Sequence, residues 1–159
     1  MDPLLKLLQE NARETHATLA TMLGLTEAEV DARIRAYEEQ GVIRGYRAVI
    51  NEDRTEVDRV EAVIEVKLTP EREGGFDRLA LRISRFPEVT AAFLMSGQAD
   101  LMLFVQGATL REVASFVSEK LATIEGVRGT VTHFMLKTYK HHGVFMETPD
   151  AYERLKVTP

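Results

Sequence analysis

The first fifty residues carry apolar positions at helical spacing, separated by short turn signals. Asp2 followed by Pro3 is typical of a helix start, because an acidic N-cap accepts a backbone N–H and proline fits the first helical position. Thr15 is expected to cap a second helix, and a third helix is predicted over about residues 27–39. The residues that give these helices their apolar faces are Leu4, Leu5, Leu7, Leu8, Leu19, Ala20, Leu23, Leu25, Val30 and Ile34.

The second and third helices fit a helix-turn-helix, in which two helices cross at a steep angle around a small core. Gly24 suits the turn between them because glycine tolerates a positive φ. Thr26 and Glu29 spell a T-x-x-E capping box, and Gly41 stands where a glycine commonly follows a helix end. Residues 43–50, IRGYRAVI, are rich in β-forming residues, so we expect a first wing strand there.

The pattern changes after residues 51–59, a polar and charged stretch that is expected to link two domains. Beyond this stretch, strands are predicted at 61–68, 89–95, 101–105 and 130–139, and helices at 76–86 and 110–124. This order is that of a ferredoxin-like βαββαβ domain, with both helices on one face of an antiparallel sheet. The sequence therefore predicts an α+β chain with a winged helix-turn-helix at 1–50, the linker at 51–59, the ferredoxin-like domain at 60–140 and a C-terminal extension at 141–159.

The predicted strands are apolar on both faces, although the two helices cover only one. Phe93 and Met95 alternate with Leu94 along one strand. On the next strand, Met102 and Phe104 alternate with Leu101, Leu103 and Val105. A large apolar sheet face left in water is unfavourable, so we expect a dimer packed sheet to sheet.

Composition excludes several classes of protein. The 159 residues include no cysteine, which rules out disulfides and thiolate metal sites. No apolar run approaches the roughly 20 residues that a membrane helix needs, and the N-terminus lacks the features of a signal peptide. We therefore expect a cytoplasmic protein with no membrane partner.

Charge does not favour nucleic-acid binding by itself. The formal net charge is −5, and residues 1–50 hold six basic and eight acidic side chains, a net of −2. Phosphate contacts depend on where charges are placed, so a local basic stripe remains compatible with DNA binding.

The third helix carries acidic residues in its first turn, Glu27, Glu29 and Asp31. Recognition helices usually present these positions to base edges, where a carboxylate can accept from cytosine. In the alternative interpretation, the acids cap the helix and complement its dipole. Candidate DNA contacts are Thr26, Arg33 and Arg35 on this helix with Arg44 and Arg47 on the wing; each arginine is equally compatible with a solvated or ion-paired position.

Two stretches resemble the leucine-responsive regulatory protein/AsnC (Lrp/AsnC) family of transcriptional regulators. The first matches the family's helix-turn-helix at Leu19, Gly24, Leu25, Thr26, Val30, Arg33, Ile34, Glu38, Gly41, Ile43, Gly45 and Tyr46. The second is the segment MSGQADL at 95–101, close to the family pattern [VL]-S-G-x-x-D-[YL], with ATIEGVR at 122–128 before the last strand. The resemblance covers residues 4–139 and implies that the second domain is the family's effector-binding and oligomerisation domain, called RAM. It also implies a homodimer or octamer that binds an amino acid between subunits.

A zwitterionic amino acid needs donors for its carboxylate and an acceptor for its ammonium group. With the resemblance, candidate effector contacts are Ser96, Gly97, Gln98, Ala99 and Asp100 in the turn, and Thr130, Thr132 and His133 on the last strand. The alternative for the turn is a plain hairpin connection, in which glycine supplies the geometry and the aspartate makes a local hydrogen bond. The alternative for the other three is ordinary strand residues.

Nothing in the sequence argues for catalysis, a cofactor or a metal. No Ser-His-Asp, paired-carboxylate or phosphate-loop pattern stands out. His141 and His142 are adjacent, and on an extended chain they would point to opposite sides and chelate poorly. In the C-terminal extension, a strand is expected near residues 143–147 and a further helix or edge strand from Pro149 to Val157.

The sequence thus predicts a sequence-specific, DNA-binding transcriptional regulator that is not an enzyme and needs no cofactor. Its partners would be double-stranded DNA, further copies of itself and an amino-acid effector. A first alternative is a small-molecule sensor or scaffold whose winged helix binds protein, which the net charge of −2 in residues 1–50 favours. A second is an enzyme of tetrapyrrole chemistry, because some proteins share this two-domain plan; against it, the second domain holds only the lone His133 before the extension.

Overall fold

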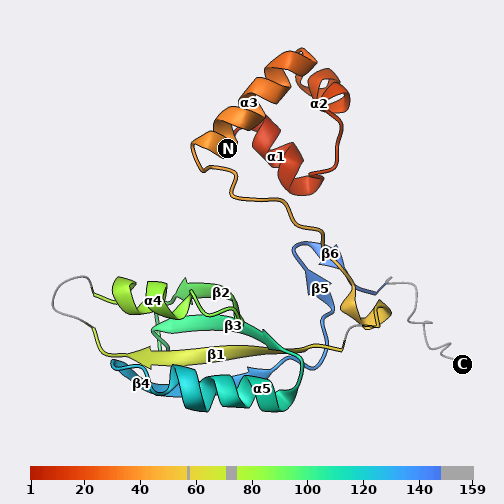
Figure 1. The fold of residues 1–159 in the computed structure, drawn as a ribbon. Helices are drawn as coiled ribbons and strands as arrows, with labels where there is room; N and C mark the ends of the chain where they lie inside the picture. The colour runs from red at the N-terminus through yellow and green to blue at the C-terminus, as the bar shows by residue number, and fades with distance from the viewer. Residues whose placement is uncertain (57, 71–74, 148–159) are drawn as a thin grey trace, which may run out of the picture. The chain divides into compact units, whose positions relative to one another are not determined.

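The structure is a computed structural model that describes residues 1–56, 58–70 and 75–147. The chain divides into two compact units, Met1–Val49 and Ile50–Pro159, and each is described by itself (Figure 1). Residues 51–56, where the sequence predicts part of a linker, fall in the second unit and contain a short 3-10 helix, η1 (Glu52–Arg54). Asn51 Nδ2 donates a 2.6 Å hydrogen bond to the carbonyl of Met146, which ties this segment to residues 140–147 of the same unit.

The first unit consists of three helices, α1 (Pro3–Glu10), α2 (His16–Leu23) and α3 (Glu27–Glu39). One apolar cluster joins them, as the sequence predicts: its buried residues are Leu4, Leu19, Ala20, Val30 and Ile34, with Leu7, Leu8, Leu23, Leu25 and Tyr37 packed around them. Burial of these side chains stabilises the unit by roughly 1.5–3 kcal/mol for each large aliphatic residue.

Side-chain caps define where these helices begin. Asp2 Oδ1 accepts the backbone N–H of Leu4 at 2.7 Å. This hydrogen bond is the main reason that the pKa of Asp2 lies below its ordinary value. Thr15 Oγ1 accepts from Thr18, and the predicted capping box forms between Thr26 and Glu29. The predicted helix starts are therefore confirmed.

The predicted wing strand is absent from the single chain. Residues 43–50 follow α3 without strand geometry, although their composition favours a strand. A strand requires hydrogen bonds to a neighbouring strand, and the described part of the first unit offers no second strand. Val42, Tyr46, Val49 and Ile50 consequently remain exposed.

The second unit is an antiparallel sheet with the strand order β2-β3-β1-β4. The strands are β1 (Val60–Leu68), β2 (Val89–Leu94), β3 (Leu101–Gly107) and β4 (Val127–Phe134). Between them lie α4 (Asp77–Ile83) and α5 (Leu110–Ser115), the latter continued by the π-helical turn η2 (Phe116–Leu121). The predicted ferredoxin-like order is confirmed.

Both helices pack on one face of the sheet, as predicted. The core comprises Ala62, Ile64, Val66 and Leu68 of β1, Leu101, Leu103 and Val105 of β3, Leu79 and Ile83 of α4, and Val113, Phe116, Leu121 and Ile124 from the α5 segment. Phe86 meets Phe116 edge to face, with ring centroids 5.5 Å apart. On β1 and β3, the strand residues that alternate with these core residues belong to the other face of the sheet.

Several element boundaries differ from the prediction. Strand β3 runs to Gly107 rather than 105, the helical segment after it ends at Leu121 rather than 124, and β4 ends at Phe134 rather than 139. Strand β4 begins at Val127 rather than at 130, because pairing with β1 carries the strand through Gly129, a residue that lowers intrinsic β-propensity. Helix α4 ends at Ile83 rather than near 86, since the chain turns toward Pro87 through weaker hydrogen bonds from Arg85 and Phe86.

The described part of the C-terminal extension forms a small hairpin. Strand β5 (Lys140–His141) pairs with β6 (Val144–Phe145), and the turn between them holds His142 at φ 46° and Gly143 at φ 84°. This left-handed turn brings the rings of His141 and His142 to 4.1 Å, so the expectation that they point apart on an extended chain is wrong. The element predicted between Pro149 and Val157 lies outside the described residues.

The described ranges hold neither a clustered metal site nor a membrane-spanning helix. No group of three or more histidine, aspartate or glutamate side chains within them is arranged to hold a metal ion. Within the same ranges, no helix combines the length and the apolar character that crossing a membrane requires.

Candidate DNA-binding helix and effector turn

The exposed side of α3 carries small residues in its first two turns, and Glu39 follows them on the same side at the end of the helix. Val30 and Ile34 face the core, so the positions two residues before each of them, Ala28 and Ala32, lie on the opposite side and are exposed. Arg33 and Arg35 are exposed on opposite flanks of this face, because they are two residues apart on a helix. Small side chains permit close approach of a helix to base edges, and flanking arginines suit phosphates.

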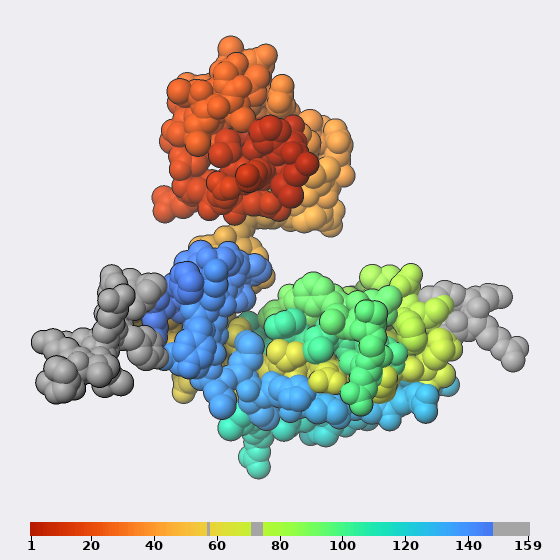
Figure 2. Space-filling view, turned by 180° about the vertical axis from the view of Figure 1, so that it is seen from behind, coloured from red at the N-terminus to blue at the C-terminus, as the bar shows by residue number. Residues whose placement is uncertain are grey.

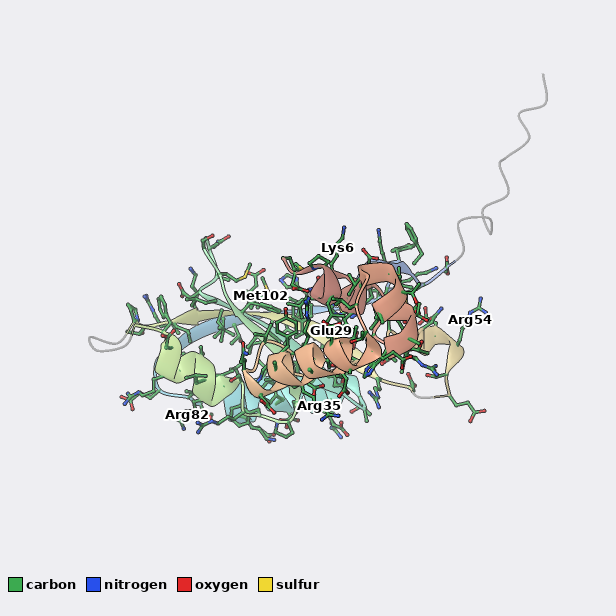
Figure 3. The ribbon with its side chains drawn as sticks, turned by 90° about the horizontal axis from the view of Figure 1, so that it is seen from above. Lys6, Glu29, Arg35, Arg54, Arg82 and Met102 are labelled. Atoms are coloured by element: carbon green, nitrogen blue, oxygen red, sulfur yellow. The ribbon has the colours of Figure 1, made fainter. Side chains whose placement is uncertain are left out.

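Arg35 is restrained inside its own unit. Its Nη2 lies 2.7 Å from Oδ2 of Asp31, one helical turn earlier, and His16 Nδ1 lies 3.8 Å from the other oxygen of Asp31. Both partners are substantially exposed, so this ion pair contributes little stability and can exchange for a phosphate. Figure 3 shows Arg35 and Glu29 on α3.

Arg33 lies in a different electrostatic setting. The pKa of Glu29 is below its ordinary value, chiefly because Glu29 accepts the backbone N–H of Thr26, and Arg33 adds a smaller favourable effect. Arg33 also contributes to the lowered pKa of Asp2. The acidic side chain of Glu29 is thus committed to capping the helix, as one of the two sequence interpretations states.

Thr26 is engaged by the same cap. Its Oγ1 accepts the backbone N–H of Glu29 at 3.2 Å and donates to Glu29 Oε2 at 2.8 Å. After the helix, Arg44 and Arg47 are exposed on residues 43–50, and the guanidinium of Arg44 folds back over Gly41. All five candidate DNA contacts therefore lie on the surface of the first unit.

The predicted effector turn connects β2 to β3 at one end of the sheet. Two backbone hydrogen bonds close it: Met95 N–H donates to Asp100 O at 2.9 Å, and Asp100 N–H donates to Val66 O at 3.0 Å. The amides of Ser96, Gly97 and Gln98 make no backbone hydrogen bond within the described residues, and the three residues are exposed. Free turn amides are suitable donors for a carboxylate.

Asp100 braces this turn against β1. Its Oδ2 accepts the backbone N–H of Leu68 at 2.8 Å. The β1–β4 register shifts between Lys67 and Leu68, so the amide of Leu68 obtains its acceptor from Asp100 rather than from the ladder. The hairpin alternative expects a local hydrogen bond from Asp100, whereas this bond joins it to a residue 32 positions earlier in the chain. The second carboxylate oxygen remains as an acceptor.

The three candidates on β4 divide between the two faces of the sheet. Thr130 and Thr132 lie opposite Val66 and Ile64 of β1, on the side covered by helices, and both are half-buried. His133 lies opposite Val63, on the other face, and is exposed. Thr130 lies at the same end of the sheet as the 96–100 turn, whereas His133 does not. A ligand bound to a single chain can therefore contact only some of these three residues.

The face opposite the helices combines apolar residues with one polar pair. His133 Nε2 lies 3.0 Å from Glu65 Oε1, and Phe93 meets Phe104 edge to face with centroids 6.0 Å apart. Phe93 is 52% exposed and Val131 53% exposed, which is high for strand residues of this size. In Figure 2, atoms of β1, β3 and β4 reach the surface side by side on this face.

Three residues that sequence reasoning missed now belong to these sites. Asp31 restrains Arg35, and the i,i+4 spacing of opposite charges signals that pair in the sequence. Glu65 pairs with His133, and Leu68 supplies the amide that Asp100 accepts. No local signal points to the last two, because they depend on strand register.

Comparison with known proteins identifies both units. A family model described as the Lrp/AsnC ligand binding domain matches residues 61–145, and one described as the AsnC-type helix-turn-helix domain matches residues 3–38. The chain is 45% identical over 159 residues to an uncharacterized HTH-type transcriptional regulator, YugG, of Bacillus subtilis, which covers 98% of this chain and 95% of the relative. It is 32% identical over 137 residues to the leucine-responsive regulatory protein of Rhizobium meliloti, covering 86% of this chain and 87% of that protein.

Solved structures share this two-domain fold. The complex of a transcriptional regulator of Neisseria meningitidis with L-Met superposes with a TM-score of 0.66 at 26% identity, over 89% of this chain and 93% of that chain. A feast or famine regulatory protein of M. tuberculosis, complexed with L-methionine, gives a TM-score of 0.69 at 26% identity, over 91% and 95% of the two chains.

Proposed function

The chain belongs to the Lrp/AsnC family of transcriptional regulators, and from that premise we propose how this member binds DNA and an amino acid. The family combines a DNA-binding helix-turn-helix with a ligand-binding domain, and both are present. The observation that carries the proposal for DNA is the outer face of α3, where small exposed side chains are flanked by arginines.

In the proposed complex, α3 enters the major groove of double-stranded DNA. Ala28 and Ala32 face the base edges, and Arg33 and Arg35 reach the phosphates on either side. Arg35 exchanges its partner Asp31 for a phosphate. Arg44 and Arg47 add phosphate contacts from residues 43–50, and Thr26 orients the helix through its cap.

We propose a homodimer formed through the sheet face that α4 and α5 leave uncovered. Phe93, Phe104 and Val131 lie on this face, and a second copy would remove them from water. The residues 43–50 would gain strand partners in the same assembly. Assembly beyond the dimer, up to the octamer that the resemblance implies, belongs to this proposal.

We propose that the effector is an amino acid held at the 96–100 turn, between subunits. The amides of Ser96, Gly97 and Gln98 bind its carboxylate, Ala99 packs beneath it, and the free oxygen of Asp100 accepts from its ammonium group. Thr130 contributes from the same end of the sheet with Thr132 behind it, and His133 contributes from the opposite face to a ligand shared with a second copy. The two methionine-bound relatives support an amino acid as the ligand class.

The alternatives are less well supported. A winged helix that binds protein instead of DNA is not favoured, because one relative is named an HTH-type transcriptional regulator and another a leucine-responsive regulatory protein. The same names favour a regulator over an enzyme of tetrapyrrole chemistry. A regulator acts where the DNA is, so in a bacterium such as the source of its 45%-identical relative we propose a cytoplasmic location.

Fluorescence anisotropy with DNA from the protein's own upstream region tests the proposal. We expect binding that weakens as salt rises and that shifts when L-methionine or a mixture of the twenty amino acids is added. Arg33→Ala and Arg35→Ala should each weaken binding, whereas Arg54→Ala, an exposed arginine of η1, should not. If Arg33→Ala and Arg35→Ala bind DNA as tightly as Arg54→Ala and the wild type, the assignment of α3 is refuted.

A further inference from the structure

Helix α4 presents a row of arginines that the proposed function does not use. Arg78, Arg82 and Arg85 follow at i, i+4 and i+7, a spacing that places them on one side of a helix and its C-terminal turn. All three are exposed, whereas Leu79 and Ile83 between them are buried in the core. Arg82 is marked on α4 in Figure 3.

This row is strongly basic for its length. Residues 77–86 contain three arginines and one acidic residue, Asp77, which stands at the first position of α4. Within the described ranges, the guanidinium groups of Arg82 and Arg85 form no ion pair and no hydrogen bond. By contrast, Lys120 is paired with Glu88 and Lys137 with Glu147. Arg82 and Arg85 therefore keep their charge available to an external anion.

The helix-turn-helix unit lacks such an excess. Its first fifty residues carry six basic and eight acidic side chains, and Arg35 must exchange Asp31 before it can bind a phosphate. Binding of a protein to DNA gains most of its salt-dependent free energy from cations placed on phosphates. A regulator whose recognition unit is net acidic gains by recruiting cations from elsewhere in its chain.

We propose that the α4 arginine row is a second DNA-contacting surface, which binds the phosphate backbone of DNA flanking the site held by α3. The proposal rests on the DNA binding proposed above and adds a sequence-independent contact to it. Arginine suits this role because its planar guanidinium is always charged and forms paired hydrogen bonds with phosphate oxygens. Arg82 and Arg85 carry the contact, and Arg78 extends the row.

A protein partner is the competing occupant of the same face. Leu81 is 62% exposed beside the arginines, and an apolar side chain in that position fits a protein interface better than a phosphate backbone. Two features favour DNA. The row contains no carboxylate after Asp77, and DNA is the extended polyanion that a protein with an AsnC-type helix-turn-helix binds. Leu81 therefore separates the two occupants experimentally.

The experiment compares two duplexes that contain the same upstream binding site. The short duplex, of about 20 base pairs, spans two half-sites one helical turn apart. The long duplex, of about 100 base pairs, adds flanking DNA and remains within one persistence length. Binding of the full chain is measured at several salt concentrations, and the slope of log K against log salt is determined for each duplex.

For the wild-type chain we expect a steeper slope on the long duplex. In Arg82→Gln with Arg85→Gln, that slope should fall by about 0.9 for each phosphate that the variant no longer neutralises, which corresponds to about eightfold weaker binding per phosphate at 0.1 M salt. Binding to the short duplex should be unchanged. The control Arg54→Gln with Arg59→Gln removes the same charge from exposed positions near the acidic residues 52–61, and it should leave both slopes unchanged.

Three outcomes would overturn the proposal. An unchanged slope for the Arg82/Arg85 variant on the long duplex refutes it while leaving the helix-turn-helix assignment intact. A smaller assembly in sedimentation for this variant and for Leu81→Ala, without a change in slope, assigns the face to protein contacts instead. A wild-type chain that binds neither duplex refutes the proposed function, and this proposal with it.

Discussion

Removing the carboxylate of Asp100 should open one end of the sheet. Its Oδ2 accepts the amide of Leu68 at 2.8 Å, and Leu68 is only 3% exposed. In Asp100→Ala that amide has no substitute acceptor from the β1–β4 ladder, because the register shifts between Lys67 and Leu68. A hydrogen bond to a charged group contributes about 1.5–3 kcal/mol, and an unsatisfied buried amide costs a similar amount. We therefore expect a loss of about 2 kcal/mol in the free energy of unfolding of the second unit.

Hydrogen exchange measured residue by residue reports this change directly. A loss of about 2 kcal/mol corresponds to roughly thirtyfold faster exchange of the Leu68 amide where exchange proceeds by opening of the unit. Asp100→Asn keeps an oxygen acceptor without the charge, so it should cost about half as much. Equal protection of the Leu68 amide in Asp100→Ala and in the wild type would refute the bracing role.

The same pair of variants separates folding from effector binding. If the free oxygen of Asp100 binds the ammonium group of an amino acid, Asp100→Asn should lose the response of DNA affinity to L-methionine, while its melting temperature should fall less than that of Asp100→Ala. A full response in Asp100→Asn would show that the turn binds its ligand without this carboxylate, and the bracing of Leu68 would then account for Asp100.

Gly126→Ala should lower the free energy of unfolding of the second unit by about 1–3 kcal/mol, and with it the melting temperature. Gly126 has φ 95°, and a Cβ there would lie 2.7 Å from Leu79 Cδ1. The matched control is Gly129→Ala, where the added Cβ would have no atom within 4 Å. Thr26→Ala should destabilise the first unit by about 1 kcal/mol in urea unfolding, whereas Thr26→Ser keeps the cap and should not. The hydrogen bond from Lys120 holds the pKa of Glu88 below its ordinary value. The pair therefore stabilises the fold at pH above the ordinary pKa of a glutamate, and this contribution is lost as pH falls through the folded-state pKa. Lys120→Met should make the free energy of unfolding fall less steeply at acid pH, and an unchanged decline would contradict the role of the pair.

Much of the fold was predictable because its signals are local. Asp2, Thr15 and Thr26 mark the three helix starts, each through a cap that joins residues two or three positions apart. The alternation in residues 61–68 and 101–105 predicts two strands and the residues that they bury. The prediction of a wing strand at 43–50 was wrong because this signal is not local. The composition favours a strand, but a strand needs a partner strand, and the described part of its unit has none.

The candidate sites divide in the same way. The exposed position of Arg33 and Arg35 follows from helical spacing, and so does the ion pair of Arg35 with Asp31. The division of Thr132 and His133 between opposite faces follows from strand alternation once the strand is known. Which of those faces the helices cover is decided only by packing, so residues 130–133 could not be sorted into one site or two beforehand.

By itself, the sequence determined the helices, most strands, their order and the family pattern, because capping, glycine geometry and hydrophobic period act over a few neighbouring residues. The tertiary structure alone decided which distant groups meet. Asp100 reaches Leu68 across 32 residues, His133 reaches Glu65 across 68, and Asn51 reaches Met146 across 95. The first two contacts depend on strand register and on one bulge, and a shift of a single residue would move every side chain of a strand to the other face. Register is set by the packing of the whole core, which no short stretch of the chain encodes.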